Sequence, residues 1–169
     1  MSKYKITLSS FSDLLDKWNK RAREAQFSHY RAEIYFRRIH KFLGLPATLF
    51  ASLTGASVYV EVQNYDNPAV DFFIAVFSFL TVILVSMQTF LKLSELAERH
   101  ISSAARYGAL RRRIEELKVG MIEGVNGVEL RKEIELIRVQ LDNLAESSPN
   151  VSKKIREKAI QVMEVEDER

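Results

Sequence analysis

The sequence predicts an all-α protein: a two-pass transmembrane helical hairpin, extended by long cytoplasmic helices and followed by two further C-terminal helices. Three observations predict this fold: two long runs without a charged residue, basic flanks outside both runs, and apolar stripes at helical spacing. We expect a single domain over residues 1–169. Its predicted parts are a cytoplasmic helix (10–41), a first transmembrane helix (42–62), an external turn (63–69), a second transmembrane helix (70–91), a cytoplasmic helix (92–119) and two C-terminal cytoplasmic helices (128–146 and 150–163).

The most apolar segment, residues 72–90, reads FFIAVFSFLTVILVSMQTF and contains no charged side chain. As a helix it would be about 28 Å long, close to the roughly 30 Å of a hydrocarbon core. Its polar residues include Ser78, Thr81 and Ser86, whose hydroxyls can bond to backbone carbonyls within lipid. We predict a transmembrane helix; the alternative is the buried central helix of a soluble bundle.

The first run, residues 42–60, reads FLGLPATLFASLTGASVYV and is richer in small residues. Ala47, Ala51 and Gly55 recur every four residues, a spacing that lets helix backbones approach closely in lipid. This small-residue face either forms a contact between helices, including the wall of a pore, or packs against the second run of the same chain. The sequence leaves both interpretations open. Gly44-Leu45-Pro46 is expected to interrupt the helix, because the residue before proline avoids the helical region.

The distribution of charge predicts the orientation. The connection EVQNYDNPAVD between the runs contains Glu61, Asp66 and Asp71 but no Lys or Arg. Basic residues concentrate on the cytoplasmic side of membrane proteins, so we predict that both termini are cytoplasmic and that the turn at Asp66-Asn67-Pro68 is external. The basic residues outside the runs are Lys20, Arg21, Arg23, Arg31, Arg37, Arg38 and Lys41 before the first, and Lys92, Arg99, Arg106, Arg111, Arg112 and Arg113 after the second.

Two heptad-like stripes extend the hairpin into the cytoplasm, and we expect them to pack as a seam. The second run and its stripe should form one long helix, since no Gly or Pro separates them before Gly108. When residues are counted along both helices from the predicted membrane edge, each large residue of one stripe lies opposite an alanine of the other stripe. The pairs are Phe36 with Ala97, Ala32 with His100, His29 with Ala104, and Ala25 with Tyr107.

The sequence shows no catalytic constellation, and we expect no enzyme activity, no cofactor and no metal. Cysteine is absent, which excludes disulfides and thiolate metal sites. His29 and His100 could meet across the seam to bind a metal or sense pH, but two packed histidines satisfied by a neighbouring Glu, Arg or water are the simpler interpretation. The run Arg111-Arg112-Arg113 is expected to pair with nearby carboxylates, so direct nucleic-acid binding is not expected.

The chain resembles the SLATT family of prokaryotic two-transmembrane effectors over about residues 14–160. The resemblance lies in REAQFSHYRAEIYFRRIHKFLGLPATLFASLTG at 23–55, in QTFLKLSELAERHISSAARYGALRRRIEEL at 88–117 and in SSPNVSKKIREKA at 147–159. It implies an inner-membrane effector of an anti-phage conflict system. It also implies a separately encoded sensor or nucleotide-signal-producing partner, such as a nucleotidyltransferase or a reverse transcriptase.

Two helices cannot enclose a pore, so a conducting state would be a homo-oligomer in contact with membrane lipid. The candidate pore-lining residues are Ser52, Thr54, Ser57, Ser78, Thr81 and Ser86. The alternative function is a non-conducting membrane anchor or scaffold that recruits a partner protein. A phage holin is a third possibility, but its function does not need such long charged cytoplasmic helices.

Overall fold

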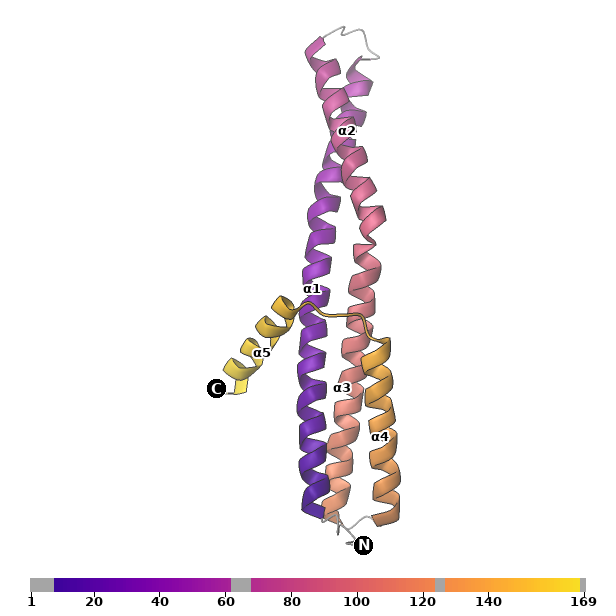
Figure 1. The fold of residues 1–169 in the computed structure, drawn as a ribbon. Coiled ribbons are helices and arrows are strands. Elements are labelled where there is room, and N and C mark those ends of the chain that lie inside the picture. The colour runs from indigo at the N-terminus through magenta and orange to yellow at the C-terminus, as the bar shows by residue number, and fades with distance from the viewer. Residues whose placement is uncertain (1–7, 62–67, 124–126, 168–169) are drawn as a thin grey trace. The chain divides into compact units, whose positions relative to one another are not determined.

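A computed structural model describes residues 8–61, 68–123 and 127–167 (Figure 1). These residues form five α-helices, and they include no β-strand. The helices are α1 (Leu8–Glu61), α2 (Pro68–Leu91), α3 (Leu93–Glu123), α4 (Gly127–Ser147) and α5 (Lys153–Asp167). The prediction of an all-α fold is therefore confirmed for the part of the chain that the structure describes.

The helices divide into two compact units, where the sequence predicted a single domain. One unit, the bundle unit, comprises residues up to Glu33 and from Glu98 onward; the other, the apolar unit, comprises Ile34–Ala97. The two units differ in the placement of their apolar side chains. In the bundle unit they form a buried core, whereas in the apolar unit most of them are exposed and join no common core.

The expected interruption at Gly44-Leu45-Pro46 is wrong, because α1 continues through Pro46. Proline has no N–H, so the carbonyl one turn earlier loses its usual donor, at a cost of about 3 kcal/mol in a helix interior. Such prolines persist where a neighbouring helix supplies polar contacts. Near Pro46 the Gln88 side chain of α2 donates a hydrogen bond to the His40 carbonyl, at 3.0 Å, whereas the carbonyl that loses its donor to the proline is that of Phe42.

The expected single helix through the second run and its stripe is also wrong, because Lys92 separates α2 from α3. Lys92 has a φ of 45°, in the left-handed region that commonly ends helices and that usually requires glycine. For a lysine this conformation costs about 1–2 kcal/mol. Its carbonyl then accepts from the Leu96 N–H, at 3.0 Å, which begins the hydrogen bonding of α3.

The remaining helix bounds differ from the predictions by a few residues. Of the predicted turn at 63–69, Pro68 and Ala69 begin α2, and the rest lies outside the described residues. Proline suits a first helical turn, where its missing N–H would have no partner. Gly120, expected in a loop, lies within α3, and α4 matches the predicted helix to within one residue at each end. In α5 the helix continues to Asp167, four residues beyond the predicted end at residue 163.

The core of the bundle unit joins α1, α3 and α4. It consists of Leu15, Leu110, Ile114, Leu130, Ile134 and Ile137, with Phe11, Leu14, Trp18, Leu117, Met121, Leu141 and Leu144 packed around them. The core residues of α4 recur at steps of four and three, so one face of the helix is buried and the opposite face is charged. Each fully buried Leu or Ile contributes about 1.5–3 kcal/mol.

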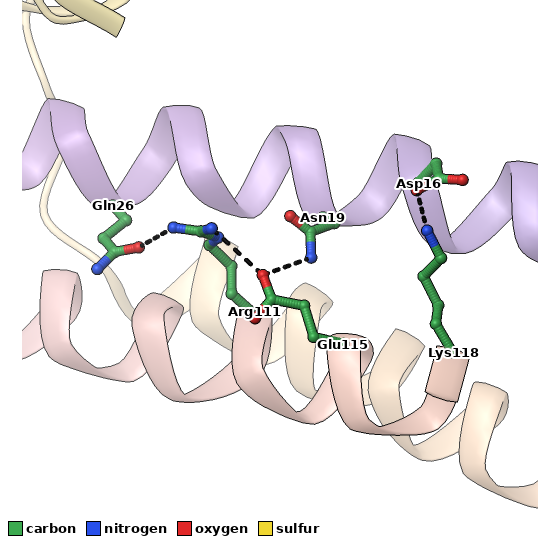
Figure 2. A network of polar contacts seen from close by, with 6 residues as sticks. All are labelled: Asp16, Asn19, Gln26, Arg111, Glu115 and Lys118. Atoms are coloured by element: carbon green, nitrogen blue, oxygen red, sulfur yellow. Dashed lines mark hydrogen bonds and ion pairs between the residues drawn. The ribbon is translucent and has the colours of Figure 1, made fainter. Parts of the chain in front are cut away.

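A polar network fixes the register of α1 against α3 (Figure 2). The Arg111 guanidinium donates to Gln26 Oε1 at 3.1 Å and to Glu115 Oε1 at 3.3 Å. Glu115 Oε1 also accepts from Asn19 Nδ2 at 3.2 Å, and Lys118 pairs with Asp16 one turn further along α3. Gly108 provides room for Gln26, because a Cβ at Gly108 would lie 2.8 Å from Gln26 Nε2.

Two arginines of the run Arg111-Arg112-Arg113 form ion pairs with carboxylates. Arg111 pairs with Glu115, and Arg113 pairs with Glu133 of α4 at 2.8 Å and donates to Gln140 at 3.0 Å. Both arginines therefore have carboxylate partners, as expected, and they link α3 to its neighbours within the bundle unit.

Candidate functional site

The most conspicuous feature of the apolar unit is the exposure of its large hydrophobic side chains. Phe42 is 77% exposed, Phe79 67% and Phe90 86%, and none of the residues of α2 is buried. The central helix of a soluble bundle would instead be buried on most of its surface. Both α1 and α2 are long and apolar enough to cross a membrane. The other large apolar residues exposed in this unit are Ile34, Tyr35, Leu45, Leu49, Leu53, Val58, Tyr59, Phe72, Phe73, Val82, Ile83, Val85, Met87 and Leu91.

Within the apolar unit, α1 and α2 make antiparallel contacts, in which earlier residues of α1 meet later residues of α2. Phe50 stacks on Phe77, with ring centroids 5.4 Å apart and planes inclined by 8°. Towards the other end of α2, the Gln88 side chain reaches the His40 carbonyl and covers Gly44. A Cβ at Gly44 would lie 2.6 Å from Gln88 Nε2, so this glycine makes the close approach possible.

The small-residue face of α1 is only partly used inside the chain. Ala47 is 4% exposed, whereas Ala51 and Gly55 are both exposed. Apart from its chain neighbours and its own helix backbone, no described atom comes within 4 Å of a Cβ built on Gly55. Packing against the second run of the same chain therefore accounts for Ala47 but not for Ala51 or Gly55, which leaves this part of the face open.

Several candidate pore-lining hydroxyls are bonded to their own helix. Ser52 donates to the Thr48 carbonyl and Ser57 to the Leu53 carbonyl, each at 2.9 Å, and Thr81 donates to the Phe77 carbonyl at 2.8 Å. This bond to the preceding turn lets Ser and Thr lie in an apolar environment. Thr54 differs, because its hydroxyl oxygen is buried without a hydrogen-bond partner among the described residues. Ser78 is half-buried and Ser86 is exposed.

In the bundle unit, the seam brings His29 of α1 against His100 of α3. Their Nδ1 atoms are 2.9 Å apart, so one Nδ1–H donates to the other nitrogen, and both rings are buried. His29 also stacks on Tyr107, with ring centroids 5.7 Å apart and planes inclined by 18°. The predicted pairing of each large residue with an alanine therefore does not describe His29. The ring of His29 is instead paired with a second histidine, His100.

The environment of the pair keeps it uncharged near neutral pH. Burial, reinforced by the neighbouring His100, lowers the pKa of His29 to about 4. Burial also lowers the pKa of His100 and raises that of the Tyr107 hydroxyl. The described residues contain no group of three or more His, Cys, Asp or Glu side chains placed to hold a metal ion. Two histidines alone supply too few ligands for a typical zinc site.

The remaining seam residues are mostly small and buried. Ala32 and Ala104 have no exposed surface, and Ala97 is 4% exposed. Phe36 and Ala25 are half-buried. Alanines at these positions let α1 and α3 approach closely, so the predicted stripes do mark buried faces of both helices.

Sequence reasoning assigned no role to the two glutamines that each cover a glycine, Gln88 on Gly44 and Gln26 on Gly108. The available signal for Gln88 was an uncharged amide within an apolar run. A buried amide needs a partner, and in lipid that partner must come from another part of the protein. The signal did not indicate which carbonyl would accept, because that depends on the register of the two helices.

No protein-family model, curated protein or solved structure matches this chain. The function is therefore argued from the side chains themselves, and the resemblance to the SLATT family stays a prediction from the sequence.

Proposed function

We propose that this protein is a two-pass membrane protein whose apolar unit spans the lipid as a helical hairpin. The observation that supports it is the exposure of many large apolar side chains on α2 and on the second half of α1, together with the absence of any buried residue on α2. Lipid is the solvent in which such a surface is favourable, whereas water would drive its aggregation. The acidic connection lies outside and both termini lie in the cytoplasm of a prokaryotic cell, following the segregation of Lys and Arg.

As a SLATT-like effector, the protein would oligomerise and open or disrupt the membrane when a separately encoded sensor is triggered. The exposed face of Ala51 and Gly55 supports a contact between subunits, because both residues are exposed and a Cβ at Gly55 would point into open space among the described residues. Small residues are favoured where transmembrane helices approach closely. In such an assembly the faces carrying Ser52, Ser57 and Thr81 would line an opening.

A non-conducting anchor or scaffold is the second candidate function, and the hydroxyls favour it. Ser52, Ser57 and Thr81 donate their hydrogens to their own helices. In this conformation they offer water only their oxygen atoms as acceptors. An anchor needs no more than the exposed apolar helices and a cytoplasmic surface that holds a partner.

Dye release from liposomes distinguishes the two functions. The full chain is reconstituted into vesicles containing a self-quenched dye, over a range of protein-to-lipid ratios. A pore-forming effector should release dye with a steeper than linear dependence on the ratio, because several subunits form each opening. Stable insertion without leakage at every ratio, together with membrane potential retained in cells killed by the triggered native system, would favour the anchor.

Two variants test the role of the open face. Gly55→Leu should reduce leakage without reducing insertion, because the Cβ position points into open space among the described residues, yet a leucine there blocks close approach of a second helix. Val82→Leu is the matched control: Val82 is 63% exposed and apolar, and it lies on α2 outside the small-residue face. Equal leakage from wild type and Gly55→Leu would contradict a helix contact at Gly55.

A further inference from the structure

A cavity of ≈ 300 Å³ lies within the bundle unit, where α1, α3 and the α4–α5 connection meet. Its polar lining comprises Ser28 and His29 of α1, Tyr107 of α3, Ser148 and Asn150 of the connection, and Arg156 of α5. A volume near 300 Å³ is at the lower end of the range for small-molecule sites. The cavity combines buried aromatic groups with several hydrogen-bonding side chains, and this suits a small organic ligand.

The charged side chains that line the cavity are positive only. None of the described residues that line it is acidic, and Arg156 is its one charged lining residue at neutral pH. The positive charges of Arg156 and Arg21 both act on the Tyr107 hydroxyl. Burial outweighs a hydrogen bond with Ser148 and these charges, and it keeps the pKa of Tyr107 above its ordinary value, so the hydroxyl stays protonated. Cationic and neutral donors without a carboxylate favour an anion.

A second cavity, of ≈ 390 Å³, lies between α3 and α4 and is a poorer anion site. One of its arginines, Arg113, is already paired with Glu133 at 2.8 Å. An anion there would compete with that carboxylate, whereas no carboxylate lines the first cavity.

We propose that the cavity lined by His29, Tyr107 and Arg156 binds a small organic anion, whose phosphate or carboxylate pairs with Arg156 and whose body lies against the aromatic groups. The site takes its walls from α1, α3, α4, the α4–α5 connection and α5, so a bound anion would hold α5 and the connection against α1 and α3. Ligand binding to the folded state alone stabilises it by mass action. The proposal does not depend on whether the protein forms pores.

The full chain, purified in an uncharged detergent, is titrated calorimetrically with phenyl phosphate, benzoate and uncharged phenol at constant ionic strength. Saturable binding of phenyl phosphate or benzoate, and none of phenol, is the expected result; the tighter of the two identifies the anionic group. Repeating the titration in phosphatidylglycerol and phosphatidylcholine nanodiscs tells a lipid headgroup from a free anion. Competition by phosphatidylglycerol assigns the anion to lipid, and its absence assigns it to a soluble molecule.

Four variants locate the site. Arg156→Gln should weaken binding by about ten- to a hundredfold, the loss expected for a charged hydrogen bond. Lys158→Gln removes an equal charge from the same helix outside the cavity and should change affinity less than about twofold. Ala145→Leu should fill the cavity from an exposed position without disturbing the core. Arg106→Gln, in the second cavity, should leave affinity unchanged.

Three results would overturn the proposal. They are the absence of saturable binding by either anion, equal weakening by Arg156→Gln and Lys158→Gln, and loss of affinity in Arg106→Gln with none in Ala145→Leu. Folding of each variant is checked by circular dichroism and by Trp18 fluorescence, because Trp18 packs against the core of this unit. These measurements involve no membrane leakage, so their failure is distinguishable from failure of the proposed function.

Discussion

Acid should destabilise the bundle unit through the buried His29–His100 pair. In the folded state the pKa of His29 is about 4, whereas an imidazole in the unfolded chain titrates near 6.5. The unfolded chain therefore binds protons first as the pH falls. Above about pH 6.5 both states are neutral and the pair carries no penalty. Between about pH 6.5 and pH 4 the free energy of unfolding decreases, and below that range this group adds no further loss.

The magnitude follows from the difference in pKa. A pKa lowered from 6.5 to about 4 corresponds, at about 1.4 kcal/mol for each pH unit, to a loss of about 3 kcal/mol. Solvent screens this penalty little, since His29 is 4% exposed. Burial lowers the pKa of His100 as well, which adds to the loss in the same direction. Domains have total stabilities of about 5–15 kcal/mol, so the effect is large enough to measure.

The variants His29→Leu, His100→Leu and the double substitution isolate the pair. At pH 7 each single change leaves one buried Nδ1 without its present partner and should cost about 1–3 kcal/mol. The double change removes both nitrogens, so it should cost less than the sum of the single changes. Between pH 7 and pH 4 the wild type should lose about 3 kcal/mol more than the double variant, which retains every other titrating group.

Urea unfolding in detergent, followed by Trp18 fluorescence at several pH values, measures these differences. Trp18 is the one tryptophan of the chain and packs against the bundle core, so its emission reports this unit specifically. The reasoning would be refuted if wild type and double variant lost equal stability on acidification. The contact would likewise be contradicted if, at pH 7, the double variant lost as much unfolding free energy as the sum of the losses of the two single variants. Chelator sensitivity of the wild type would instead indicate a metal between the rings.

Three further predictions concern topology and packing. A reporter active only outside the cytoplasm should give a signal when fused at Asp66 and none when fused at the C-terminus; the reverse result contradicts the orientation. Ala104→Phe should cost about 1–3 kcal/mol of unfolding free energy because Ala104 has no exposed surface, whereas Ala105→Phe, at an exposed position, should be nearly neutral. Gln88→Leu should cost about 0.5–1.5 kcal/mol by removing the hydrogen bond to the His40 carbonyl; unchanged thermal stability in detergent would argue against that contact.

The helical character of the chain could be read from the sequence, because periodicity and the absence of charge are local properties. The helical spacing of apolar residues in α4 predicted the ends of that helix to within one residue at each end. The uncharged runs identified the two helices that are long and apolar enough to cross a membrane. Carboxylate partners for Arg111 and Arg113 were also expected, since Glu115 lies one turn from Arg111 and the following predicted helix is rich in glutamate.

Other features depend on how helices meet, and local pattern does not contain that information. Pro46 predicted a break that is absent from α1, while nothing near Lys92 indicated the break found there. The sequence showed that His29 and His100 share a seam, but their direct contact requires a particular rotation and register of α1 against α3. Likewise, Ala47 and Gly55 are equivalent in a four-residue repeat, and only packing decided that Ala47 is covered and Gly55 is open.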